Sequence, residues 1–117
     1  MTLPREATLL RIFIGEDDKS RDRRPLYEAI VLEARAAHLA GATVLRGPMG
    51  FGHSSRLHTT KILRLAEDLP LVIEIVDAQD KISAFLPRLE TIMPTGLVTL
   101  EKVQVVRYGP ETERVAP

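Results

Sequence analysis

Leu71-Val72-Ile73-Glu74-Ile75-Val76 is the stretch that decides the fold. All of its residues except Glu74 are apolar and most are β-branched, which favours a strand at the centre of a sheet. Outward from it, the run over 8–14 alternates, so that two sets of side chains lie on opposite faces of another predicted strand. One face carries Leu10, Ile12 and Ile14, and the other carries Leu9, Arg11 and Phe13.

Two amphipathic helices are predicted, one before and one after the central strand. Pro25 suits the first helical position because no N–H is needed there, and Gly41 is expected to end this helix. Asp77 or Asp80 is predicted to cap the second helix, and Pro87 is expected to kink it. The first helix has its apolar face at Leu26, Ala29, Ile30, Ala34 and Ala37. The second has its apolar face at Ile82, Phe85, Leu86, Leu89, Ile92 and Met93.

The other segments complete a β-α-β-β-α-β order. Residues 43–46 form a short strand and residues 97–106 a final one, whereas residues 54–69 suit either a helix or a long loop. The charged run 16–24 is expected to be a solvated loop that buries nothing. This order predicts a ferredoxin-like α+β domain over 1–109, with two helices on one face of the sheet and a loose tail over 110–117.

The second face of the predicted sheet is too apolar for free exposure to solvent. Leu9, Phe13 and Val72 lie on it, together with Arg11 and Glu74. A solvated sheet face is normally more polar than this. We therefore expect Arg11 and Glu74 to pair, and we expect this face to be covered by other copies of the chain.

Composition narrows the function classes. The 117 residues include 16 basic and 16 acidic side chains, five aromatic residues and no cysteine. Disulfides, thiolate metal sites and thiol nucleophiles are thereby excluded. The balanced charge and few aromatic residues argue against nucleic-acid binding. No apolar run approaches the length of a membrane span, so the sequence predicts a cytoplasmic protein without membrane insertion.

A glycine-rich stretch, Gly47-Pro48-Met49-Gly50-Phe51-Gly52, follows the short strand. Backbone N–H groups there could hold a phosphate, or the glycines could simply form a tight turn. Arg46 and Arg107 are candidate phosphate contacts, because guanidinium groups bind phosphate in a bidentate manner. Other polar residues of the region are more simply interpreted as loop or surface residues: His53, Arg56, His58 and Lys61. No catalytic constellation and no metal site are predicted.

Several blocks of the sequence resemble the DUF190 family of PII-like proteins. The resemblance covers about residues 10–109 and rests on five blocks that agree in order and spacing. They are LRIFIGE, PLYEAIVLEARAAHLAGATVLRG, GFGHSSRLHT, LAEDLPLVIEIVD and GLVTLEKVQV. More distantly, the chain is similar to the PII signal-transduction proteins. That similarity implies a ferredoxin-like homotrimer with its sheets facing inward.

The resemblance also implies a ligand site. PII proteins bind adenine nucleotides in clefts between subunits, and Gly50-Phe51-Gly52 matches the GFG sequence at the base of their effector loop. Gly96 matches one glycine of their phosphate loop, and Arg107 matches one of two phosphate-facing arginines. Leu71 stands where PII proteins have a phosphate-binding lysine. The implied ligand is an adenine nucleotide, with AMP, ADP and cyclic forms needing fewer cations than ATP.

The function implied by the resemblance is regulatory and non-enzymatic. A homotrimer would sense a small ligand in an intersubunit cleft and modulate a partner through the loop over about 50–69, for which the glycines form the hinge. Family members are often encoded near membrane transport proteins, which implies a transporter as one kind of partner. The alternatives are a nucleotide-processing enzyme, a protein-interaction module without a ligand, and an RNA-binding domain.

Overall fold

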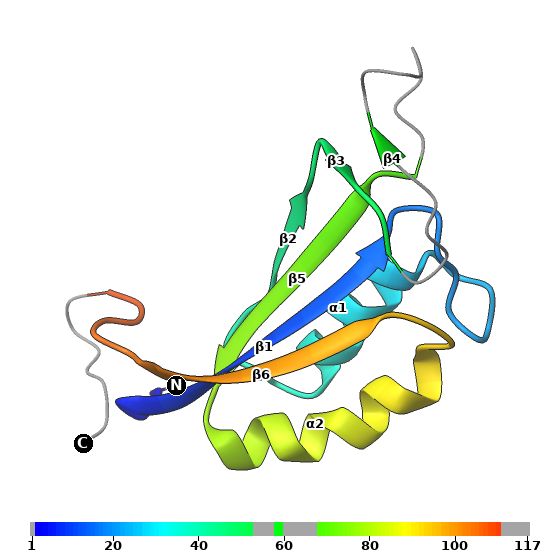
Figure 1. The fold of residues 1–117 in the computed structure, drawn as a ribbon. Helices are drawn as coiled ribbons and strands as arrows, with labels where there is room; N and C mark the ends of the chain where they lie inside the picture. Colours follow the sequence, from blue (N-terminus) through cyan, green and yellow to red (C-terminus); the bar gives the residue numbers. More distant parts are fainter. Residues whose placement is uncertain (1, 53–57, 60–67, 111–117) are drawn as a thin grey trace.

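The computed structural model describes residues 2–52, 58–59 and 68–110, and it confirms the predicted β-α-β-β-α-β order (Figure 1). The two helices lie on one face of a four-stranded sheet and leave the other face uncovered (Figure 1). The main elements are β1 Glu6–Gly15, α1 Leu26–Ala36, β2 Thr43–Arg46, β5 Pro70–Asp77, α2 Gln79–Ile92 and β6 Leu97–Gln104.

The sheet has the order β2-β5-β1-β6, and all its neighbouring strands are antiparallel. The predicted central strand, β5, lies beside β1, with Ile12 opposite Ile73. Side chains that alternate along these two strands meet both helices in one hydrophobic core. The largest fully buried side chains of this core are Phe85, Leu10, Ile12, Leu26, Ile30, Ile73, Ile75 and Ile82.

Helix α1 begins and ends at other residues than predicted. Pro25 lies one residue before the helix, with an extended ψ of 124°, and the helix ends at Ala36 rather than near Gly41. His38 has a φ of 58° and donates its backbone N–H to Arg35 O, and Leu39 donates to Ala34 O. These bonds form a Schellman motif, in which His38 adopts the left-handed conformation usual for glycine.

Helix α2 starts without the predicted aspartate cap. Its N-cap residue is Ala78, and no side chain bonds to the first turn. Asp77 is buried, and its carboxylate accepts hydrogen bonds from the backbone N–H groups of Ala40 and Ala78. The helix continues past Pro87 to Ile92.

The charged segment 16–24 is folded, which corrects the expectation that it buries nothing. Ser20 is buried, and its hydroxyl accepts a bond from the Arg24 backbone N–H and donates one to Asp22. The Ser20 hydroxyl lowers the pKa of Asp22, and Arg24 adds to this effect. Arg21 donates to the carbonyl of Met93 at 3.0 Å, which satisfies the C-terminal end of α2.

Two short strands, one within the glycine-rich stretch and one after it, were not predicted. β3 Met49–Gly50 pairs antiparallel with β4 His58–Thr59, so residues 58–59 are not helical. Residues 54–57 and 60–67 of the ambiguous segment, and the predicted tail from residue 111, lie outside the described residues.

A second, smaller hydrophobic cluster lies at the end of the sheet where β1 begins and β6 ends. β6 ends at Gln104, two residues earlier than predicted, and Val105 then donates its backbone N–H to Arg5 O at 2.7 Å. Tyr108 donates its hydroxyl to the Ala40 carbonyl at 2.8 Å. The buried members of this cluster are Leu3, Ala7 and Val105.

Candidate functional site

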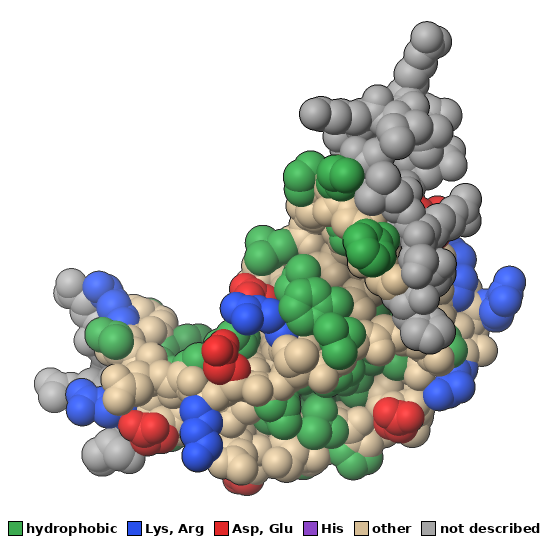
Figure 2. Space-filling view, viewed as in Figure 1, with side chains coloured by type: hydrophobic (Ala, Val, Ile, Leu, Met, Phe, Trp, Pro, Cys, Tyr) green, Lys and Arg blue, Asp and Glu red, His purple; other side chains and the backbone are tan. Residues whose placement is uncertain are grey.

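The uncovered face of the sheet carries an apolar row at one end. Strand pairing places Leu45 opposite Val72 and Phe13 opposite both Val72 and Leu97, so the row crosses all four strands. Leu45 and Leu97 are 48% and 58% exposed at the two edges. Figure 2 shows hydrophobic side chains gathered on this face beside a group of charged ones. We name these four residues the apolar row.

Next to the apolar row, on the same face, β1 and β5 carry the predicted ion pair. Arg11 Nε donates to Glu74 Oε2 at 2.8 Å, which confirms the pairing expected from the sequence. Glu101, which the sequence analysis did not single out, lies 3.8 Å from Arg11 Nη1. The hydrogen bond to Glu74 raises the pKa of Arg11. A paired charge group thus lies beside the apolar row on this face.

The glycine-rich stretch packs against Pro70, where the chain returns to the sheet. A Cβ on Gly47 would lie 3.1 Å from Pro70 Cγ, and one on Gly50 would lie 3.2 Å from the same atom. Among the described glycines, the positive φ values belong to Gly96 and Gly109, so Gly47 and Gly50 do not adopt a left-handed conformation. Because Gly47 and Gly50 have no side chain, the backbone after β2 can lie close to Pro70 at the start of β5.

Beyond β3 the backbone is open. Phe51 is 71% exposed, and a Cβ on Gly52 would meet nothing within 4 Å. Phe51 and the backbone of Gly52 are therefore accessible from solvent. Of the predicted polar neighbours, His53, Arg56 and Lys61 lie outside the described residues.

Arg46 is the last residue of β2 and lies at the start of this stretch. Its guanidinium Nη2 pairs with Glu16 Oε2, from the turn after β1. The sequence analysis missed Glu16, because 30 positions separate it from Arg46. In this structure the candidate phosphate contact is already paired with a carboxylate.

Gly96 lies at the same end of the sheet but at its opposite edge. Its φ is +125°, and a Cβ there would lie 2.6 Å from Met93 Cε and 3.2 Å from the Phe13 carbonyl oxygen. Three strand spacings, about 14 Å, separate the two edges. Gly96 therefore has a clear packing role, and β1 lies between its strand and β5, on which Pro70 contacts Gly50.

Arg107 is exposed and lies at the other end of the molecule, beyond the end of β6. The eight residues of that strand span roughly 26 Å at the usual rise. Val105 and Tyr108, which are anchored in the small cluster, hold the backbone on both sides of it. Within one chain, Arg107 is thus separated from Arg46, Gly50 and Gly96.

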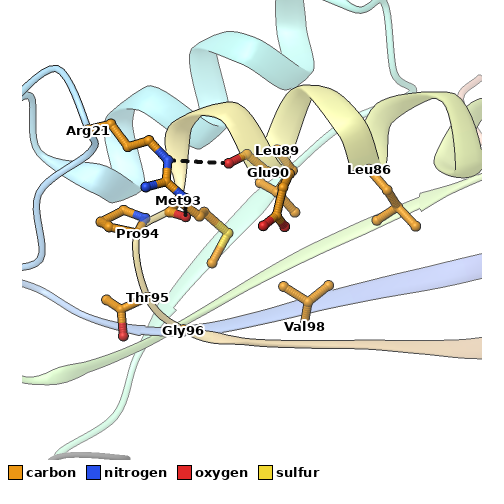
Figure 3. Close-up of a pocket in the computed structure, with 9 residues that line it drawn as sticks. All are labelled: Arg21, Leu86, Leu89, Glu90, Met93, Pro94, Thr95, Gly96 and Val98. Atoms are coloured by element: carbon orange, nitrogen blue, oxygen red, sulfur yellow. Dashed lines mark hydrogen bonds between the residues drawn. The ribbon is translucent and has the colours of Figure 1, made fainter.

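A pocket of about 380 Å³ lies on the helix side, between the end of α2 and β6 (Figure 3). Leu86, Leu89 and Val98 form apolar walls, and Arg21 lies across the end of the helix. The guanidinium group of Arg21 donates its hydrogen bonds to backbone carbonyl groups at the end of α2 and is therefore already occupied. The pocket is mainly a gap where α2 does not cover edge strand β6. No group of residues suited to hold a metal ion is found within the described ranges.

The strand order and the two helices on one face define a ferredoxin-like fold, which is also the fold of PII-like proteins. The family model of DUF190, described as Uncharacterized ACR, COG1993, matches residues 7–105, and the chain belongs to this family. No helix within the described part of the chain is both long and apolar enough to cross a membrane.

Similar proteins occur in distant organisms. The chain is 39% identical over 98 residues to a UPF0166 protein of Aquifex aeolicus (strain VF5), covering 84% of this chain and 91% of that protein. It is 32% identical over 103 residues to a UPF0166 protein of Methanocaldococcus jannaschii, covering 87% and 94%.

Solved structures support the same fold. One is CPII, a nitrogen regulatory PII-like protein from Thiomonas intermedia K12, bound to ADP, AMP and bicarbonate. Its TM-score is 0.60 at 17% identity, over 87% of this chain and 90% of that one. CPII bound to ADP and bicarbonate gives a TM-score of 0.58 at 18% identity, with the same coverage.

Proposed function

We propose that this protein is a PII-like regulatory protein, which binds a small ligand between its subunits and modulates a partner protein without catalysing a reaction itself. The observation that carries the proposal is the position of the candidate ligand contacts. Arg46 and Gly50 lie at one end of the sheet and Arg107 at the other. A ligand that contacts both groups must bind where two subunits meet.

The uncovered sheet face supports the assembly that such a site requires. A homotrimer with its sheets facing inward would bury the apolar row and surround the Arg11–Glu74 pair. Covering an apolar surface of this kind is favourable because water leaves it. Partners would be recognised through the segment that follows β2, over about residues 50–69.

An adenine nucleotide is the ligand class that we propose. CPII, which shares the fold, is bound to ADP and AMP in one solved structure and to ADP in another. The accessible backbone after β3 can donate N–H groups to phosphate, and Arg107 of a neighbouring copy can add a bidentate contact. Leu71 lies where PII proteins have a lysine, so AMP or ADP fits the available cations better than ATP does.

Calorimetric titration with AMP, ADP, ATP and cyclic AMP tests the proposal. We expect at least one of them to bind in the micromolar range, and Arg107→Ala should weaken that binding about tenfold or more without changing the oligomer. If none binds better than millimolar, the sensor function is wrong and an interaction module without a ligand gains support. Formation of a product from ATP would instead support an enzyme.

A mixing experiment tests whether two subunits share the site. Arg46→Ala and Arg107→Ala chains are each expected to bind poorly. When the two are unfolded and refolded together, a shared site should be restored at about one position in four, because one chain supplies each arginine. Recovery of no sites in verified mixed oligomers would contradict a shared site.

A further inference from the structure

Glu16 contacts both ends of the segment between β2 and β5. Its backbone N–H donates to the Leu69 carbonyl at 2.8 Å, where the chain returns to the sheet. Its carboxylate pairs with Arg46, where the chain leaves the sheet. A single residue of the turn after β1 therefore joins two points that are 23 positions apart in the sequence.

A further hydrogen bond holds this turn against the residues where the chain returns to the sheet. The Asp17 backbone N–H donates to Asp68 Oδ1 at 2.9 Å. A Cβ on Gly15 would lie 2.7 Å from the same oxygen, so a side chain at that position would push the Asp68 carboxylate away. The turn after β1 is thus bonded through its backbone to Asp68 and Leu69, where the chain returns to the sheet. It contacts Arg46, where the chain leaves the sheet, through the Glu16 side chain.

The side chains of Arg46 and Glu16 differ in their exposure to solvent. The Arg46 side chain is 59% exposed and that of Glu16 is 20% exposed. An anion from solvent can therefore reach the guanidinium group, whereas the Glu16 carboxylate is mostly shielded from solvent. Arginine offers a fork of donors that suits phosphate as well as carboxylate, so the two acceptors would compete for it.

We propose, building on the proposed function, that Glu16 is a positioning residue of the ligand site. It holds Arg46 in the absence of ligand, and an anionic ligand at the adjacent glycines displaces it from the guanidinium. Because the Glu16 backbone is bonded to Leu69, the state of Arg46 is transmitted to the return of the segment. Glu16 consequently lowers affinity for phosphate groups and couples their binding to both ends of the segment.

The ligand test compares Glu16→Gln with Asp17→Asn in titrations with ADP and with inorganic pyrophosphate. Both variants remove one negative charge at neighbouring positions, but in this structure the paired carboxylate is that of Glu16. We expect Glu16→Gln to raise affinity about two- to fivefold, the range of an exposed ion pair, and Asp17→Asn to raise it less. Equal increases would indicate a general charge effect and overturn the proposal.

A second measurement needs no ligand. Hydrogen exchange at the Glu16 amide, which bonds to Leu69, should be about two- to fivefold faster in Arg46→Gln than in the wild type, and Arg46→Lys should restore most of the protection. An unchanged exchange rate in Arg46→Gln would overturn the coupling. If the wild type binds neither ADP nor pyrophosphate, the proposed function and the competition at Arg46 both fail, while exchange alone still decides the coupling.

Discussion

Asp77 joins three segments of the chain through one buried carboxylate. One oxygen accepts the Ala40 backbone N–H from the loop after α1, and the other accepts the Ala78 N–H at the start of α2. The Ala40 carbonyl in turn accepts the Tyr108 hydroxyl from the segment after β6. A residue that looks like a helix cap in sequence is therefore a link between distant loops, and it stabilises the end of the sheet near Arg107.

Replacing Asp77 with alanine is expected to lower the free energy of unfolding by about 1–3 kcal/mol, because two backbone donors lose their acceptor. Asp80→Ala is the matched control, since Asp80 is exposed in the first turn of the same helix. It should change stability by less than about 0.5 kcal/mol. Urea unfolding measures both values, and equal effects would contradict the role of Asp77.

At the scale of elements, the end of α1 shows how local backbone conformation overrides a glycine signal. The helix stops at Ala36, five positions before Gly41, because Leu39 is buried in the core and the chain must turn back to bring it there. The Schellman motif makes this turn, with His38 at a φ of 58°. The side chain of His38 itself is exposed.

Substitution His38→Gly should therefore stabilise the protein by about 1 kcal/mol, because the left-handed conformation costs a residue with a Cβ about that much. His38→Ala keeps the Cβ and should give no increase. Chemical denaturation of the three proteins tests this prediction. A gain in the alanine variant equal to that in the glycine variant would show that the histidine side chain, and not its backbone, is the cause.

For the whole molecule, the arrangement of side chains on edge strand β2 separates two surfaces. Leu45 belongs to the apolar row on the uncovered face, opposite Val72, whereas Val44 lies opposite Ile73 on the side of the helices. Both are partly exposed, at 48% and 38%. Leu45 and Val44 thus have similar exposure but lie on opposite faces of the sheet.

In the proposed trimer, Leu45→Glu should dissociate the assembly, because a charge would replace apolar contact at an interface. Val44→Glu is expected to leave it intact. Sedimentation velocity at micromolar concentration checks the outcome. Trimers that survive in Leu45→Glu but not in Val44→Glu would place the interface on the helix side, and a monomeric wild type would contradict the assembly itself.

The sequence by itself determined the order of the main elements, the composition of the core and the Arg11–Glu74 pair. These features follow from periodicity, since alternation over 8–14 and 71–76 decides which side chains share a face of the sheet. The position of the pair followed from the same alternation. The ends of the helices were harder to predict from the sequence, as Gly41 and Asp77 show, because several local signals compete there.

Only the tertiary structure decided which distant groups meet. The pairing of Glu16 with Arg46 and the bond of Asp77 to Ala40 depend on contacts between segments far apart in the chain, and the short strands β3 and β4 depend on pairing with each other. The structure also placed Arg107 at the opposite end of the sheet from Arg46. Sequence patterns report on nearest neighbours along an element, whereas these positions arise from how whole elements pack in space.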